Sequence, residues 1–131
     1  MKRATIQGEK AIAKPALLCS VLLRYVIDDI YDNRIYLDQG LRHSYESIYR
    51  WAHGKGNTKI EYPFYFLHND GFWHLNWFNG QEIKTESPST KFMEQNVNYA
   101  SLDDDLWFLI RNLEYNSKLF KFIRENMLPK W

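Results

Sequence analysis

Residues 61–75, which read EYPFYFLHNDGFWHL, decide the expected fold of this chain. Asn69-Asp70-Gly71 signals a tight turn, because a glycine after Asn and Asp supplies the positive φ that hairpin turns require. The aromatic residues on both sides of this turn fit a pleated, half-buried surface. The stretch therefore predicts a β-hairpin made of two short, aromatic-rich strands.

Helical patterns surround this stretch. Apolar side chains recur at helical spacing over residues 16–30 and again over residues 38–52. Ser89, Ser101 and Ser117 are candidate N-caps for three shorter helices nearer the C-terminus. The fold class expected from these patterns is α+β and mainly helical, with four to five helices packed against one small antiparallel β-hairpin or sheet.

The length and composition indicate one globular domain. The chain has 131 residues, of which 45% are hydrophobic and 17% are aromatic, enough apolar material for a single core. Residues 1–14 are polar and basic and are expected to form a flexible arm. Pro15 suits the first turn of a helix, so residues 15–131 are expected to form a single domain.

Charge and cysteine content exclude some classes of protein. The net charge of +1 disfavours indiscriminate coating of nucleic acid, although it allows a local basic face. Cys19 is the only cysteine, which rules out an intrachain disulfide and a Cys-x-x-Cys metal site, and its apolar neighbours predict that it is buried. The apolar run at residues 15–23 is too short to span a bilayer, so a cytoplasmic location is expected.

The residues do not form a recognisable catalytic pattern. The chain has neither a nucleophile-elbow serine nor a glycine-rich phosphate loop, so we expect no enzyme activity and no cofactor. The acidic run at residues 103–105 is expected in the first turn of a helix, where negative charge is favourable. His68 and His74 are expected to face each other across the hairpin as polar residues. A phosphate contact or a metal site remains an alternative for this pair.

Basic residues gather around the Tyr62-Pro63 pair in the sequence. Positive side chains beside exposed aromatic rings are typical of nucleic-acid surfaces, where the cations hold phosphates and the rings contact sugars or bases. A solvated helix face is the alternative for each arginine. The basic residues concerned are Arg34, Arg42, Arg50, Lys55 and Lys59 before or at this pair, and Lys84 and Lys91 after the expected hairpin.

Short motifs in a characteristic order resemble the sulfur-binding domain of HNH-type, modification-dependent restriction endonucleases. The likeness covers roughly residues 13–128. The motifs are Lys14-Pro15-Ala16-Leu17-Leu18, Asn33-Arg34-Ile35, Tyr62-Pro63-Phe64, Asn69-Asp70-Gly71-Phe72-Trp73 and Tyr99-Ala100-Ser101-Leu102-Asp103.

The resemblance implies recognition of phosphorothioate-modified, double-stranded DNA by an apolar pocket flanked by basic residues. Such a module is the recognition part of a restriction system used in bacterial defence, with a nuclease fused to it or separate. The resemblance thus implies that residues 15–131 form a single DNA-recognition domain, with no nuclease domain in this chain. By position, Tyr62 and Pro63 match the wall of the family's pocket, and Phe66 stands where a smaller residue is expected. Arg34 matches a basic residue near the modified phosphate. Lys84 or Lys91 matches the basic residue beyond the hairpin. His68 is added as a candidate phosphate contact.

Two other functions are compatible with the sequence. One is a winged-helix-like DNA binder that uses the hairpin as its wing and has no sulfur requirement. The other is a protein-interaction module whose exposed aromatic residues meet a partner, the candidates being Phe72, Trp73, Trp77, Phe78 and Trp131.

Overall fold

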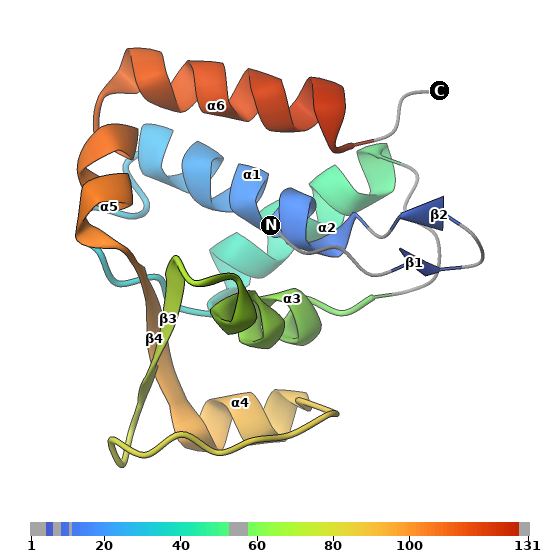
Figure 1. Ribbon diagram of the computed structural model, residues 1–131, viewed down its shortest axis with the longest axis vertical. Helices are drawn as coiled ribbons and strands as arrows, with labels where there is room; N and C mark the ends of the chain where they lie inside the picture. The colour runs from blue at the N-terminus through green and yellow to red at the C-terminus, as the bar shows by residue number, and fades with distance from the viewer. Residues whose placement is uncertain (1–4, 7–8, 11, 53–57, 129–131) are drawn as a thin grey trace.

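The computed structural model describes residues 5–6, 9–10, 12–52 and 58–128 of this chain (Figure 1). Helices dominate it, and the expected α+β, mainly helical class is confirmed. The elements in chain order are strands β1 (Thr5–Ile6) and β2 (Glu9–Lys10), helices α1 (Ala13–Val26), α2 (Gln39–Trp51) and α3 (Glu61–Phe66), the 3-10 helix η1 (Leu67–Asp70), strand β3 (Trp73–Trp77), helix α4 (Thr90–Asn96), strand β4 (Val97–Leu102), and helices α5 (Asp104–Ile110) and α6 (Leu113–Asn126).

Helix α1 lies at the centre of the molecule and contacts α2, α3 and α6. Figure 1 shows α6 running along one side of α1, while α4 lies at the far end of the molecule, beyond α3. The core fills the space between these helices and the β3–β4 ladder. Its largest fully buried side chains include Trp73, Tyr45, Tyr65, Phe64, Leu17 and Ile35.

Strands β3 and β4 pair antiparallel, from Trp73 opposite Leu102 to Trp77 opposite Val97. The register shifts between Asn76 and Trp77, which marks an irregularity near the α4 end of the ladder. On the other edge of β4, Ile35 and Ala100 exchange backbone hydrogen bonds of 2.7 and 2.8 Å. Strand β4 therefore has a backbone partner on each side.

The predicted hairpin at residues 61–75 is wrong. Residues 61–70 form α3 and η1, and only residues 73–75 belong to a strand, whose partner is β4. Phe64 and Leu67 are fully buried on the inner side of this helical segment, so tertiary packing outweighs the strand preference of its aromatic residues. Gly71 does adopt the positive φ expected of it, 89°, but it ends η1 and does not form a hairpin turn.

An ion pair fixes the segment where the turn was expected. Lys14 Nζ donates to Asp70 Oδ2 at 2.7 Å, which ties η1 to the first turn of α1. The Asp70 side chain is buried in this contact, with an exposed fraction of 1%. A tight hairpin turn at the same residues would expose this carboxylate to solvent.

Two of the predicted helix starts are confirmed. The Asp38 side chain caps α2 by accepting a hydrogen bond from Leu41 N at 2.9 Å. The Ser89 side chain caps α4 by accepting one from Phe92 N at 3.0 Å. In both helices the capping side chain lies three residues before its donor, a purely local geometry that sequence alone encodes.

The other two predicted caps are wrong. Ser101 lies within β4, and Asp103 is the residue that precedes α5. Helix α6 begins at Leu113, because Asn112 accepts a hydrogen bond from Tyr115 N at 3.0 Å, so Ser117 lies inside that helix. The expected placement of acidic residues in the first turn of α5 is confirmed.

The expected arm at residues 1–14 has the wrong boundary, because α1 begins at Ala13 and β1 pairs with β2. Residues 1–4, 7–8 and 11 lie outside the described residues. Cys19 is fully buried as predicted, and burial raises the pKa of its thiol to about 12. Among the described helices, not one is long and apolar enough to cross a membrane.

Candidate nucleic-acid interface

Tyr62 and Pro63 lie in the first turn of α3, where proline is tolerated because the missing N–H has no partner to lose there. Pro63 is buried, while Tyr62 keeps 39% of its surface exposed. The Phe66 ring packs one helical turn further along, with its centroid 6.2 Å from that of Tyr62. The larger residue at position 66 therefore occupies space beside Tyr62.

The exposed side of Tyr62 lines an open groove between the start of α3 and the loop before α4. This groove, called the Tyr62 groove below, has a volume of about 460 Å³. It combines one aromatic ring, one lysine, one carboxylate and several hydroxyl groups, so apolar contacts and hydrogen-bonding groups lie side by side in it. Its lining residues are Thr58, Lys59, Glu61, Tyr62, Ser87, Pro88, Ser89 and Thr90.

A second groove adjoins the first and is called the Arg50 groove below. It has a volume of about 400 Å³ and shares Thr58, Lys59 and Thr90 with the Tyr62 groove. Helix α2 contributes Arg50, which is exposed, and Glu46 to its lining. The two grooves together place three cations, Arg42, Arg50 and Lys59, beside aromatic side chains, and the carboxylates of Glu46 and Glu61 belong to the same linings.

Two tyrosines of α2 anchor the segment that carries Lys59. The Tyr45 hydroxyl donates to the backbone oxygen of Thr58 at 2.8 Å, and the Tyr49 hydroxyl donates to Thr58 Oγ1 at 3.3 Å. On the other side of the lysine, Ile60 is buried in the core. Lys59 therefore extends from a short backbone segment that is fixed at both ends.

A buried carboxylate joins the three elements that border the grooves. Arg42 Nη2 of α2 donates to Glu61 Oε2 of α3 at 2.5 Å, and Thr90 Oγ1 of α4 donates to the same oxygen at 3.1 Å. Burial raises the pKa of Glu61, but the hydrogen bonds from Arg42 and Thr90 and the Arg42 charge outweigh it, so this pKa lies below its ordinary value. Arg42 thus acts mainly as a positioning residue that holds α2 against α3.

Arg34 lies at the edge of β4 and lines neither groove. Its guanidinium carbon is 5.7 Å from the centroid of the Tyr99 ring, a cation–π distance. The Tyr36 ring also packs on Tyr99, with centroids 5.6 Å apart. Arg34 therefore belongs to an exposed cluster of Arg34, Tyr36 and Tyr99, separate from the residues that line the Tyr62 groove.

His68 and Lys84 lie toward the C-terminal end of α3. His68 Nδ1 is 2.5 Å from the Tyr65 carbonyl, and its Nε2 is 3.9 Å from Glu82. The Tyr65 hydroxyl donates to the Ile83 carbonyl at 3.1 Å and accepts from Thr85 N at 3.1 Å. Tyr65 thereby fixes the backbone on both sides of Lys84, whose side chain is exposed.

The expected His68–His74 pair is wrong, because the hairpin that would have aligned the two residues does not form. His74 lies on β3 and pairs through Nε2 with the Asp103 carboxylate that precedes α5. Within the described ranges, His, Cys, Asp and Glu side chains form no group of three or more that is placed to hold a metal ion.

The structure brings only part of the predicted set together. Tyr62 and Lys59 share a groove, and Lys91 follows Thr90, which lines both grooves. Sequence reasoning missed the loop at residues 87–90, which supplies half of the Tyr62 groove. The signal in the sequence is its run of hydroxyl-bearing residues, of which only Ser89 enters the prediction, as a helix cap.

Comparison with known proteins adds no assignment to this geometry. Neither a protein-family model nor a curated protein sequence matches the chain.

Proposed function

We propose that this chain is a DNA-binding module that recognises a phosphorothioate linkage in double-stranded DNA. In this proposal the module supplies recognition in a modification-dependent restriction system and leaves DNA cleavage to a fused or separate nuclease. The Tyr62 groove receives the modified phosphate, and the cations along the two grooves hold the neighbouring phosphates.

The observation that supports this proposal is the position of Tyr62. Its partly exposed ring lines the same groove as Lys59 and the hydroxyl groups of Ser87 and Ser89. The ring offers an apolar contact, while lysine and hydroxyl groups offer hydrogen-bond donors to phosphate oxygens. A groove that has both kinds of contact matches a phosphate group in which one oxygen is replaced by sulfur.

The selectivity follows from desolvation. Sulfur is larger and less well hydrated than oxygen, so placing it against the Tyr62 ring costs less hydration energy than placing a phosphate oxygen there. A difference of this kind for one group is on the order of 1–3 kcal/mol. Phe66 packs against Tyr62 but does not line the groove, so the sulfur contact in this proposal is the Tyr62 ring alone.

The other predicted basic residues, Lys84, Lys91 and Arg34, contact phosphates outside the Tyr62 groove in this proposal. Lys91, at the start of α4, and Lys84, in the loop held by Tyr65, contact the backbone on either side of the modified phosphate. Arg34 contacts a more distant phosphate from the β4 edge, supported by its stacking on Tyr99. These contacts are electrostatic, so they contribute to the binding of any duplex and carry no sulfur preference.

The direct test is a binding titration of the full chain against one short duplex, prepared with and without a single phosphorothioate linkage, at several salt concentrations. We expect binding to the sulfur-containing duplex to be tighter by about tenfold, or roughly 1.4 kcal/mol. Equal affinity for the two duplexes would contradict sulfur recognition and leave a general DNA binder. Absence of binding to both would contradict the whole proposal.

A protein-interaction role is the second candidate, favoured by a different surface. Phe108 is 71% exposed and Leu113 is 60% exposed at the α5–α6 corner, and Phe122 is 57% exposed on α6. Large apolar side chains that remain this exposed often mark contact surfaces. Of the residues predicted for such a surface, Trp73 is fully buried, whereas Phe78 is 56% exposed. The winged-helix alternative lacks its wing, since no hairpin forms at residues 61–75.

A further inference from the structure

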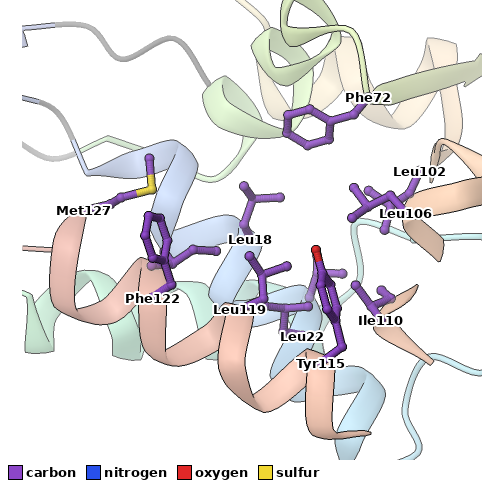
Figure 2. Close-up of a pocket in the computed structure, with 12 residues that line it drawn as sticks. Leu18, Leu22, Phe72, Leu102, Leu106, Ile110, Tyr115, Leu119, Phe122 and Met127 are labelled. Carbon is purple, nitrogen blue, oxygen red and sulfur yellow. The ribbon is translucent and has the colours of Figure 1, made fainter. Parts of the chain in front are cut away.

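An apolar cavity lies where α6 crosses α1 and α5, away from the two grooves (Figures 1 and 2). It has a volume of about 200 Å³ and is partly open to solvent. Helices α1, α5 and α6 contribute aliphatic and aromatic side chains to its walls, and Phe72 lies at the end next to the β3–β4 ladder. Lining residues used in the argument are Leu18, Leu22, Phe72, Leu106, Tyr115 and Leu119.

The lining is apolar except for one hydroxyl group. None of the described residues that line the cavity carries a charge. Figure 2 shows the Tyr115 ring along one wall, with its oxygen directed into the space between Leu18 and Leu106. The backbone N–H of Tyr115 donates to Asn112, but its hydroxyl makes no hydrogen bond with another described residue. The cavity therefore presents a single available hydrogen-bonding group.

The size and chemistry of this cavity define a class of ligand. We propose that it binds a small, neutral, mainly apolar molecule that carries one hydrogen-bonding group, of which phenol is the simplest example. Dry apolar cavities of roughly 150 Å³ are known to accept benzene, so this cavity has room for a ring with a substituent. A charged ligand is disfavoured, because the cavity offers no counter-charge to replace lost hydration.

The Tyr115 hydroxyl gives the proposed site its selectivity. A hydroxyl or carbonyl group on the ligand can form a hydrogen bond with Tyr115, while the ring contacts the leucines. One neutral hydrogen bond corresponds to about a fivefold difference in affinity. We therefore expect phenol to bind about fivefold more tightly than benzene, which fills the same space without such a group.

The experiment is a titration of the full chain, with its methyl groups isotopically labelled, with benzene and with phenol, followed by NMR. We expect saturable shifts at the methyl groups of Leu18, Leu22 and Leu119, with tighter binding of phenol. Tyr115→Phe should reduce phenol affinity to that of benzene while leaving benzene affinity unchanged. This variant removes one oxygen atom and keeps the ring, so loss of folding does not complicate the result.

A matched pair of variants tests the location of the site. Leu106→Phe enlarges a side chain that lines the cavity, whereas Leu109→Phe makes the same change on α5 at a residue that does not line it. We expect the first variant to abolish benzene binding and the second to retain it, with the spectrum of each reporting whether it is folded. Should Leu106→Phe unfold the chain, the Tyr115→Phe comparison decides.

Three outcomes would overturn the proposal. Shifts that do not saturate, or that are largest at the exposed Leu113, would show non-specific contact with the surface. Equal phenol affinity in the wild type and Tyr115→Phe would exclude the hydroxyl group as the selective element. Equal benzene binding in a folded Leu106→Phe variant and in Leu109→Phe would place the ligand elsewhere.

Discussion

The side-chain amide of Asn33 makes both of its hydrogen bonds with the backbone of Leu102, 69 residues later in the chain. Asn33 Nδ2 donates to the Leu102 carbonyl at 2.7 Å, and the Leu102 N–H donates to Asn33 Oδ1 at 2.8 Å. The Asn33 side chain thereby makes the pair of backbone hydrogen bonds that a residue of a neighbouring strand would make at the end of β4. This contact holds the segment that carries Arg34 against the ladder and places the Arg34–Tyr99 stack.

Substitution of Asn33 with Ala should lower the free energy of unfolding by about 1–3 kcal/mol, because two partly buried backbone groups of Leu102 lose their partner. Urea denaturation measures this change. Asn79→Ala, at an exposed loop position, is the control and should change stability by less than about 0.5 kcal/mol. Equal effects of the two variants would contradict the structural role given to Asn33.

The stabilisation that the Glu61 carboxylate contributes should be lost in acid, so the free energy of unfolding should fall as the pH is lowered. Its pKa is lowered in the folded state, so the unfolded state takes up the proton at higher pH. The stabilisation is then complete above the ordinary pKa of about 4.3 and is lost as the pH falls through the folded value. We expect Glu61→Gln to be less stable than the wild type at pH 7, with the gap closing at low pH. Urea denaturation across this pH range checks the prediction.

Substitution of Arg42 with Met should change the pH dependence of stability in the opposite direction. Without the cation, burial remains as the largest influence on Glu61 and should raise its pKa above the ordinary value. The variant should lose about 3 kcal/mol at pH 7, the lower end of the range for breaking a buried pair, and recover stability on acidification. A pH profile that parallels the wild type would contradict this account of the pair.

Tyr65→Phe should release the loop that carries Lys84. The hydroxyl group fixes the backbone at Ile83 and Thr85, so its removal should accelerate hydrogen exchange of the Thr85 amide and cost about 1–2 kcal/mol of stability. Tyr25→Phe is the matched control, because the Tyr25 ring packs edge-on against Trp107 and keeps that contact. Unchanged exchange at Thr85 in Tyr65→Phe would contradict the anchoring role.

Tyr62→Ala should remove the preference for sulfur while leaving the affinity for unmodified duplex largely intact. The expected tenfold preference should fall toward equal binding, because the apolar wall is lost. Tyr62→Phe keeps the ring and should keep the preference. A competition assay between the two duplexes measures both variants. Retention of the preference in Tyr62→Ala would show that the sulfur contact lies elsewhere.

Lys59→Gln should weaken binding to both duplexes similarly and reduce the salt dependence of binding by about one counterion. The exposed side chain extends from an anchored segment, so the loss of charge should not disturb the fold. Lys121→Gln removes the same charge at an exposed position of α6, a helix that Figure 1 shows on the opposite side of α1 from α3, and should leave both quantities unchanged. Equal losses in the two variants would point to a general effect of net charge.

Local signals account for the parts of the fold that sequence analysis predicted. Helix α2 begins after Asp38 and α4 begins after Ser89, because each cap needs only a side chain and a backbone N–H three residues away. The same reasoning failed at Ser101, where pairing with β3 extends β4 through the expected cap. A cap signal is outweighed when a long-range strand partner is present.

The candidate site was predicted only in part for the same reason. Tyr62 and Lys59 are close in sequence, and both line the Tyr62 groove. The loop at residues 87–90 reaches Tyr62 because α4 packs beside α3 and Thr90 donates to Glu61. That contact spans 29 residues, and local spacing does not encode it.

The sequence by itself determined the fold class, the α2 and α4 starts, the burial of Cys19 and the positive φ of Gly71, because each depends on nearest neighbours or on composition. Only the tertiary structure decided that residues 61–70 form α3 and η1, that β4 pairs with β3, and that Arg34 stacks on Tyr99. The burial of Phe64 and Leu67 against the core outweighs the weak local preference of aromatic residues for strands. That energy exists only once distant segments have come together.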